Sequence, residues 1–240
     1  MPSHKRFSEI DIWRGTALVG MIIFHFFFIL NYFNIFASAM REGGWLVLAR
    51  FVQFSFLFLV GISLALAGRS YKKQFKRALM VFGLGMIISL VTFIFAPDEY
   101  VKFGMLHLIG VSIFVLSFMA DKKYLPLMFG IGIFVISFFI SKIPTSSIIL
   151  FAVGLKGDSI ASLDYFPVFP WMGIAAFGVS FGNIYKNFRS KFDFQPKKTN
   201  PLNSLSFLGR HTLLIYMAQI PAMILVMIMF GIIPLNALFS

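Results

Sequence analysis

Residues 6–32 read RFSEIDIWRGTALVGMIIFHFFFILNY, a short charged lead followed by an apolar segment that carries one histidine, His25. From Trp13 onward the segment is mostly apolar over about 20 residues, which is enough for a helix to cross a bilayer. At about 100° per residue, Asp11, Arg14 and His25 fall within one arc of roughly 60°. A rise of about 1.5 Å per residue places His25 roughly 16 Å deeper than Arg14. The stretch predicts a first membrane span with a charged entrance below a buried imidazole.

The composition of the whole chain is that of a membrane protein. Of its residues, 59% are hydrophobic and only 12% are charged, and the mean hydropathy is +0.87. A soluble domain cannot bury that much apolar surface, so we predict an all-α integral protein of the cell membrane that crosses the bilayer several times. We find no repeat and no second soluble domain, which predicts a single domain over residues 1–240.

The charge and the residue types exclude several functions. The chain has no Cys, which excludes disulfides, thiolate catalysis and Cys-bound metals. The net charge of +12 would suggest nucleic acid as a partner of a soluble chain. Here the basic residues lie in short loops between apolar stretches, where they set the orientation of the spans, so we expect no nucleic-acid partner.

Seven apolar stretches predict a bundle of about seven transmembrane helices. If the N-terminus is cytoplasmic, 16 of the 21 Lys and Arg residues lie on the cytoplasmic side, which supports that orientation. Residues 143–165 hold an apolar piece too short to span, so we read them as an outer loop and leave open whether it partly re-enters the membrane. The predicted spans are about 13–34, 46–67, 78–96, 103–120, 124–141, 166–185 and 205–230.

Four spans place a polar side chain at nearly one depth. Counted from the cytoplasmic end of each span, His25 lies about 18 Å deep, and His107, Gln53 and Gln219 lie about 20 to 21 Å deep. Polar groups this deep are costly and face a bundle interior or a wet cavity. Gln53 and Gln219 could be bonds between helices, and His107 a satisfied core residue. For His25 we favour a functional role, because two charged residues share its helical face.

The residue types make His25 the best candidate for a general base or a nucleophile. A neutral imidazole in a dry pocket takes a proton from a hydroxyl or amine that attacks a carbonyl, or attacks the carbonyl itself. The cytoplasmic cations suit a polyanion that enters from below, with Arg14 the innermost of them. On the outer side, Asp164 opens a stiff aromatic segment that is either an interfacial anchor or a wall for an acceptor. Two histidines on different spans without a nearby carboxylate make a metal site improbable.

Five segments together resemble a known family. The opening pattern I-D-x-x-R-G-x-A at residues 10–17 is followed by M-x-x-F-H at residues 21–25. With the later segments, this pattern resembles the bacterial and archaeal membrane family related to the catalytic domain of heparan-α-glucosaminide N-acetyltransferase, and more distantly the transmembrane acyltransferase superfamily. The later segments are QFSFLFLVGISL (53–64), FGMLHLIGVS (103–112), DYFPVFPWMG (164–173) and LGRHTLLIYMAQIP (208–221).

The resemblance implies an enzyme that moves an acetyl or other short acyl group from cytoplasmic acyl-CoA to an extracytoplasmic hydroxyl or amine, as on a sugar or glycan. His25 matches the catalytic histidine of the O-acyltransferase branch, and Arg14 matches an arginine associated there with the donor. In the animal enzyme the catalytic histidine lies after the first span, and residues 34–45 here contain no His. The final motif often has a His where this chain has Gln219.

These inferences give one set of candidate residues, with acetyl-CoA or another acyl-CoA as donor and no metal. The resemblance leaves open whether the protein works as a homodimer within the lipid bilayer. We assign His25, His107 and Asp164 as catalytic, and Asp11, Arg14, Arg210 and Gln219 as cofactor-binding.

Two other functions stay open at this point. A transporter or proton-coupled permease could use the same buried layer of His and Gln side chains as an ion path. Against it, the chain has no second half that resembles the first and no pair of spans broken by Gly or Pro. A scaffold without catalysis would tolerate alanine at His25.

Overall fold

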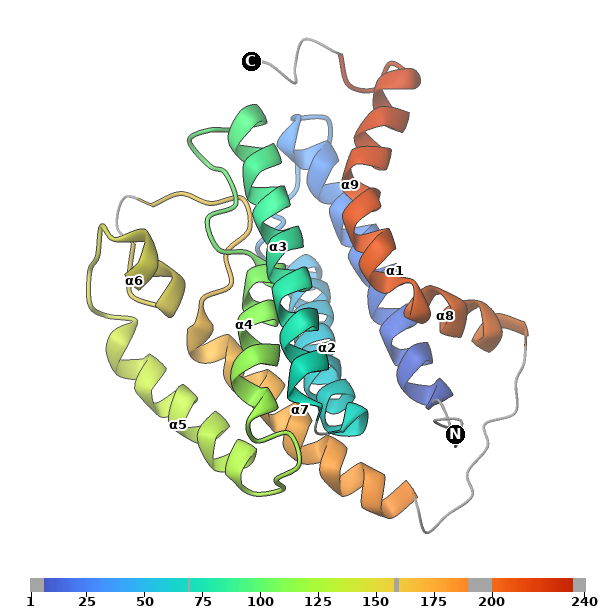
Figure 1. The fold of residues 1–240 in the computed structure, drawn as a ribbon. Coiled ribbons are helices and arrows are strands. Elements are labelled where there is room, and N and C mark those ends of the chain that lie inside the picture. Colours follow the sequence, from blue (N-terminus) through green and yellow to red (C-terminus); the bar gives the residue numbers. More distant parts are fainter. Residues whose placement is uncertain (1–6, 69, 158–159, 190–199, 235–240) are drawn as a thin grey trace. The chain divides into compact units, whose positions relative to one another are not determined.

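The computed structural model describes residues 7–68, 70–157, 160–189 and 200–234, and this part of the chain is helical, without strands. Figure 1 shows the helices in chain order. They are α1 (Ser8–Tyr32), α2 (Gly43–Ala67), α3 (Tyr71–Phe95), α4 (Met105–Ser117), α5 (Leu125–Ile140), α6 (Ile148–Val153), α7 (Val168–Arg189), α8 (Asn200–Arg210) and α9 (Thr212–Met229).

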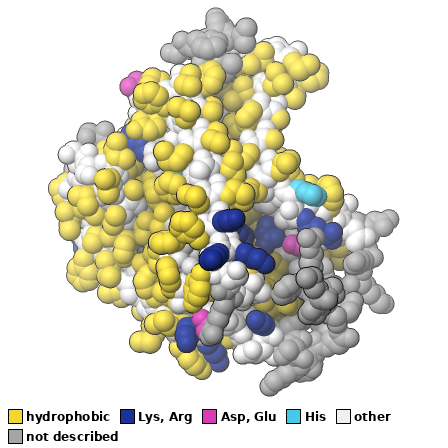
Figure 2. Space-filling view, viewed as in Figure 1, with side chains coloured by type: hydrophobic (Ala, Val, Ile, Leu, Met, Phe, Trp, Pro, Cys, Tyr) yellow, Lys and Arg dark blue, Asp and Glu magenta, His cyan; other side chains and the backbone are white. Residues whose placement is uncertain are grey.

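The helices confirm an all-α membrane protein. Among the described residues, α1, α2, α3, α7 and α9 are long and apolar enough to cross a membrane, with mean hydropathies of 1.2 to 2.5. The shorter apolar helices α4 and α5 coincide with the predicted fourth and fifth spans. Hydrophobic side chains cover most of the face seen in Figure 2, as expected of a surface that meets lipid. The cytoplasmic orientation of the N-terminus stays a prediction.

The predicted last span, 205–230, was too long at its N-terminal side. The helix stops at Arg210 and starts again at Thr212, so α8 is a separate helix and the apolar span begins with α9. The physical reason is composition, since α8 reads NPLNSLSFLGR and carries polar residues through most of its length. In the predicted outer loop, α6 has six residues and is too short to cross a bilayer. Whether residues 143–165 partly re-enter the membrane stays a prediction.

Contacts divide the chain into two compact units. The first unit contains residues up to Phe56 together with residues from 194 onward, and so holds α1, the first half of α2, α8 and α9. The second unit, residues 57–193, holds the rest of α2 and α3 to α7. A single domain over residues 1–240 stays a prediction, and each unit is described by itself below.

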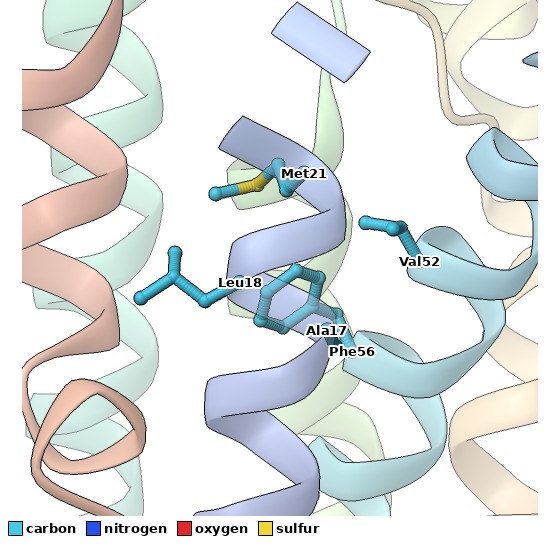
Figure 3. Packing of buried hydrophobic residues seen from close by; sticks show 5 residues of the cluster. All are labelled: Ala17, Leu18, Met21, Val52 and Phe56. Atoms are coloured by element: carbon cyan, nitrogen blue, oxygen red, sulfur yellow. The ribbon is translucent and has the colours of Figure 1, made fainter. Parts of the chain in front are cut away.

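In the first unit, α1 forms the centre of the apolar core. Ala17, Leu18 and Met21 of α1 pack with Val52 and Phe56 of α2, and all five are at most 8% exposed (Figure 3). Side chains of α8 and α9 pack against this cluster. A smaller cluster further along joins α1 to α9 and the residues after it, namely Ile29, Met227 and Ile233. The residues that follow His25 are therefore held against α9 by apolar packing.

In the second unit, α3 packs along α4, α5 packs along α7, and α4 also contacts α7. Close packing at small residues joins α2 to α7. A Cβ atom added to Gly61 of α2 would meet the backbone oxygen of Ala175, and one added to Gly178 of α7 would meet that of Phe58. Only glycine lets the two backbones approach this closely.

Candidate active site

A charged cluster lies where α1 and α8 pack together. Arg14 donates a hydrogen bond from Nη1 to Oδ1 of Asp11 at 2.9 Å and another to the backbone oxygen of Gly209 at 3.4 Å. Nε of Arg210 lies 3.8 Å from Oδ2 of the same carboxylate. Asp11 therefore holds two guanidinium groups, which leaves the cluster with a net positive charge. The structure brings together three of the four residues predicted to bind the cofactor.

Two glycines determine this meeting of helices. A Cβ atom on Gly15 would meet the backbone oxygen of Leu205, and one on Gly209 would meet the backbone oxygen of Asp11. Because neither helix has a side chain at these points, α8 lies close enough for Arg210 to reach Asp11. Arg210 also donates from Nη2 to Oγ of Ser206 at 3.2 Å, which fixes the guanidinium from its own helix.

The predicted catalytic histidine of the first span pairs with α9. Nδ1 of His25 lies 2.8 Å from Nε2 of Gln219. Gln219 is buried, at 6% exposure, and its Oε1 has no hydrogen-bond partner in the described part of the chain. With α1 unbroken between them, His25 lies roughly 16 Å along the helix axis from Arg14. Helix α1 thus carries His25, which pairs with the neutral amide of α9, and Arg14, which belongs to the positive cluster.

The four polar groups predicted at one depth have different partners, and their common depth stays a prediction. His25 and Gln219 meet, whereas Gln53 accepts a hydrogen bond from Nη1 of Arg50 on its own helix at 3.1 Å. His107 lies in the second unit. Of the four residues estimated to lie at one depth, His25 and Gln219 contact each other.

The other two residues predicted to be catalytic, His107 and Asp164, both lie at the start of α4 in the second unit. The segment before α4 runs beside the segment before α7, with the backbone N–H of Phe166 donating to the oxygen of Phe103 at 2.9 Å. Oδ2 of Asp164 accepts from the backbone N–H of Met105 at 3.0 Å. Nδ1 of His107 accepts from the backbone N–H of Gly104 at 3.2 Å. Both side chains therefore satisfy backbone donors at the N-terminus of α4.

The surroundings of His107 are those of a structural histidine. The ring is 2% exposed, stacks on Phe103 with 5.5 Å between ring centroids, and lies over Gly85. Because Nδ1 accepts a bond, Nε2 carries the proton and faces Oγ of Ser89 at 3.4 Å. The Ser89 hydroxyl in turn donates to the oxygen of Val101. Both ring nitrogens are engaged, and a catalytic role of His107 stays a prediction.

Asp164 lies in the loop before α7, outside the membrane-spanning helices. Burial raises the pKa of its carboxyl from 3.8 to about 6, while the bond from the backbone N–H of Met105 acts in the opposite direction. A carboxyl with such a pKa exchanges its proton near neutral pH. That property suits a group that holds or relays a proton of a hydroxyl or amine.

Two partners were missed by the sequence reasoning. Nε1 of Trp13, next to Arg14, donates to Oγ of Ser55 at 3.1 Å, and Ser55 is fully buried. Ser89 completes the contacts of His107. The only signal in the sequence was a lone serine within an apolar span, which is too common to single out. Among the described residues, no group of three or more His, Asp or Glu side chains could hold a metal ion.

A family model described as "Heparan-alpha-glucosaminide N-acetyltransferase, catalytic" matches residues 6–221. The chain belongs to this family. The match confirms the resemblance and identifies a membrane protein of an acetyltransferase family. The matched residues run from just before α1 to the middle of α9. They include the charged cluster, the pair of His25 with Gln219, and Asp164. No curated protein and no solved structure matches the chain.

Proposed function

We propose that the protein transfers an acetyl or other short acyl group from cytoplasmic acyl-CoA to an extracytoplasmic hydroxyl or amine, such as that of a sugar or glycan. The observation that supports this most directly lies on α1. This helix carries Asp11 and Arg14, which Arg210 of α8 joins, and roughly 16 Å further along its axis it carries His25, paired with a buried amide of α9. This arrangement suits a ligand with an anionic head and a reactive end.

The charged cluster is the proposed site for the phosphates of acyl-CoA. Guanidinium groups bind phosphate through paired, charge-assisted hydrogen bonds. Arg14 is 22% exposed and Arg210 is 44% exposed at their side chains, while Asp11 is 15% exposed. The carboxylate thus orients both arginines, and Arg210 keeps the larger accessible surface. The flexible pantetheine arm of the donor would carry the thioester along α1 toward His25.

Further along α1, His25 is the group proposed to promote attack on the thioester carbonyl. As a base it takes the proton of the acceptor hydroxyl or amine during attack, and the same proton then goes to the departing CoA sulfur. As a nucleophile it forms an acyl-imidazole that the acceptor opens in a second step. Both routes give the same products.

The acceptor is proposed to meet Asp164, which the predicted topology places on the extracytoplasmic side. A partly protonated carboxyl at neutral pH can donate to one sugar hydroxyl and accept from another. We propose the cell membrane as the location and leave a homodimer to be tested by mass measurement of the purified protein.

The decisive experiment measures acetyl transfer and acetyl-CoA binding by the purified protein. His25→Ala should insert and fold like the wild type, bind acetyl-CoA with a similar dissociation constant, and lose transfer by at least about a thousandfold. Gln53→Leu is the matched control, because it removes a polar group at a similar estimated depth that pairs only with Arg50 in the structure.

Two results would overturn the proposal. Unchanged turnover of His25→Ala would remove the histidine mechanism. Solute flux in liposomes without CoA, together with no stabilisation by acetyl-CoA in thermal unfolding, would favour the transporter instead.

A further inference from the structure

We propose that Gln219 is a positioning residue that decides which nitrogen of His25 carries the proton. This inference rests on the proposed function of His25, and it gives that function a control element on α9. The supporting geometry is a 2.8 Å contact between a ring nitrogen and a buried amide whose second polar atom, Oε1, has no partner.

The amide side chain has two faces that act oppositely on the ring. In the observed orientation the amide NH2 donates to Nδ1, so in the neutral ring the proton is on Nε2. In that tautomer Nε2 donates a hydrogen bond and cannot accept a proton. In the other tautomer the Nε2 proton has left to solvent and Nδ1 has taken one up. When the amide turns over, Oε1 accepts a bond from this Nδ1–H, and the lone pair of Nε2 is available to a substrate.

In the observed orientation Oε1 is the amide atom left without a partner among the described residues, whereas the turned orientation leaves the NH2 group without one until a donor binds. A buried polar atom without a partner costs about 1 to 3 kcal/mol. Turning the amide gives Oε1 the Nδ1–H partner and moves the NH2 group into the place of Oε1. A hydrogen-bond acceptor, such as the carbonyl oxygen of a bound acyl donor, would stabilise the NH2 group there. Donor binding and the base form of His25 are thereby linked.

Charged groups of the first unit do not replace the amide in this role. The described contacts of His25 are with Gln219 and the ring of Phe24. From Thr212 to Met229, α9 has no Asp, Glu, Lys or Arg, and Tyr216 is its single titratable group. The remaining charged or titratable residues on the described elements of the unit are Glu9, Asp11, Arg14, Tyr32, Arg41, Glu42, Arg50, Arg210 and His211.

With the amide turned, the transfer step balances. The acceptor O–H gives its proton to Nε2 as its oxygen bonds to the thioester carbon, while Nδ1–H stays bonded to Oε1. The C–S bond then breaks, and the proton on Nε2 passes to the sulfur. The products are the acyl ester and free CoA thiol, and His25 and Gln219 return to their starting state.

The test combines nitrogen NMR of the ring with kinetics. Protein labelled with 15N-histidine distinguishes the two neutral tautomers, and the His25→Ala protein identifies the signals of His25. We expect the Nε2–H form in the wild type without donor, and a mixture of both forms in Gln219→Met, which keeps the length of the side chain but has no amide. In Gln219→Glu the carboxylate should fix the Nδ1–H form.

The kinetic arm separates positioning from binding. Gln219→Met should lower kcat by about tenfold, which corresponds to about 1.4 kcal/mol, with little change in KM for the donor. In Gln219→Glu the acid limb of the pH-rate profile should move up by at least about one pH unit, because the carboxylate stabilises the imidazolium. The tautomer change in Gln219→Met, together with its lower kcat at unchanged KM, distinguishes positioning from a structural role, since lost packing would not move the proton between the ring nitrogens.

Two outcomes overturn the inference without touching the proposed function. One is an unchanged tautomer in Gln219→Met. The other is a raised donor KM with an unchanged kcat and pH profile, which would make Gln219 a donor-binding residue. Full activity of His25→Ala would instead refute the proposed function, and the NMR arm would still report on the ring and the amide.

Discussion

Asp164 gives a quantitative prediction about stability and pH. Burial disfavours the charged form of its carboxyl and raises the pKa to about 6 in the folded protein, against the ordinary 3.8 in the unfolded chain. Below pH 3.8 both states are protonated and no stability is lost. Between pH 3.8 and about 6 the unfolded chain ionises while the folded protein keeps its proton, so the stability falls as pH rises. Above about 6 the loss is constant.

The magnitude follows from the difference in pKa. About two units, at 1.36 kcal/mol each, give a loss of about 3 kcal/mol at pH 7 relative to pH 3.8. Asp164→Asn cannot ionise, and its Oδ1 can still accept from the backbone N–H of Met105. The variant should therefore lack this pH dependence and gain on the wild type as pH rises, by roughly 6 to 12 °C in Tm at pH 7.

Thermal unfolding of the detergent-solubilised wild type and variant, in steps from pH 4 to pH 7.5, measures this difference. Asp98→Asn is the matched control, because Asp98 is an exposed acid on the loop before α4. Its Tm should follow that of the wild type at every pH. A constant Tm difference between Asp164→Asn and the wild type across this range would refute the reasoning, since it would mean that Asp164 titrates alike in both states.

Two further predictions concern the charged cluster. Arg210→Ala should weaken acetyl-CoA binding about tenfold or more and leave the acceptor KM unchanged, because it removes one of the two guanidinium groups around Asp11. Titration calorimetry measures the affinity for acetyl-CoA, with Arg50→Ala as the control. A selective defect in acceptor binding would contradict this prediction. Gly209→Ala should lower the unfolding free energy by about 1 to 3 kcal/mol, because the new Cβ meets the backbone of Asp11 and separates α8 from α1. The same separation should weaken acetyl-CoA binding. A variant with the Tm and the acetyl-CoA affinity of the wild type would show that α8 does not depend on this contact.

Much of the fold could be predicted from hydrophobic runs, because a bilayer fixes the length and polarity of each span. The positions of Asp11 and Arg14 on one helical face followed from helix periodicity, and the structure pairs them. The break between α8 and α9 was missed, because an apolar run that continues through Leu213 and Leu214 masked the polar residues before it. The polar composition of residues 200–210 was the signal that separates α8 from the apolar span.

The candidate site was predictable only where depth is a sufficient guide. Helix rise placed His25 and Gln219 at similar depths, and a buried polar group needs a partner at its own level, so their contact could be anticipated. The same estimate grouped Gln53 with them, but its amide found a partner one turn away on its own helix. Depth says nothing about direction around the helix axis, and that direction is set by packing.

The partners of the remaining polar groups are backbone N–H groups, and the spacing of residues in the sequence does not predict such contacts. Asp164 and His107 both bind backbone N–H groups at the start of α4, where a helix end leaves donors unsatisfied. A sequence identifies an acid and a histidine near a helix start, but both an end cap and a catalytic pair produce that pattern. The distinguishing feature is the number of engaged atoms. His107 has both nitrogens bonded, whereas His25 has one bond, to an amide that can present either a donor or an acceptor. This difference is why, of the two rings, we propose His25 rather than His107 as the group that exchanges a proton with the substrate.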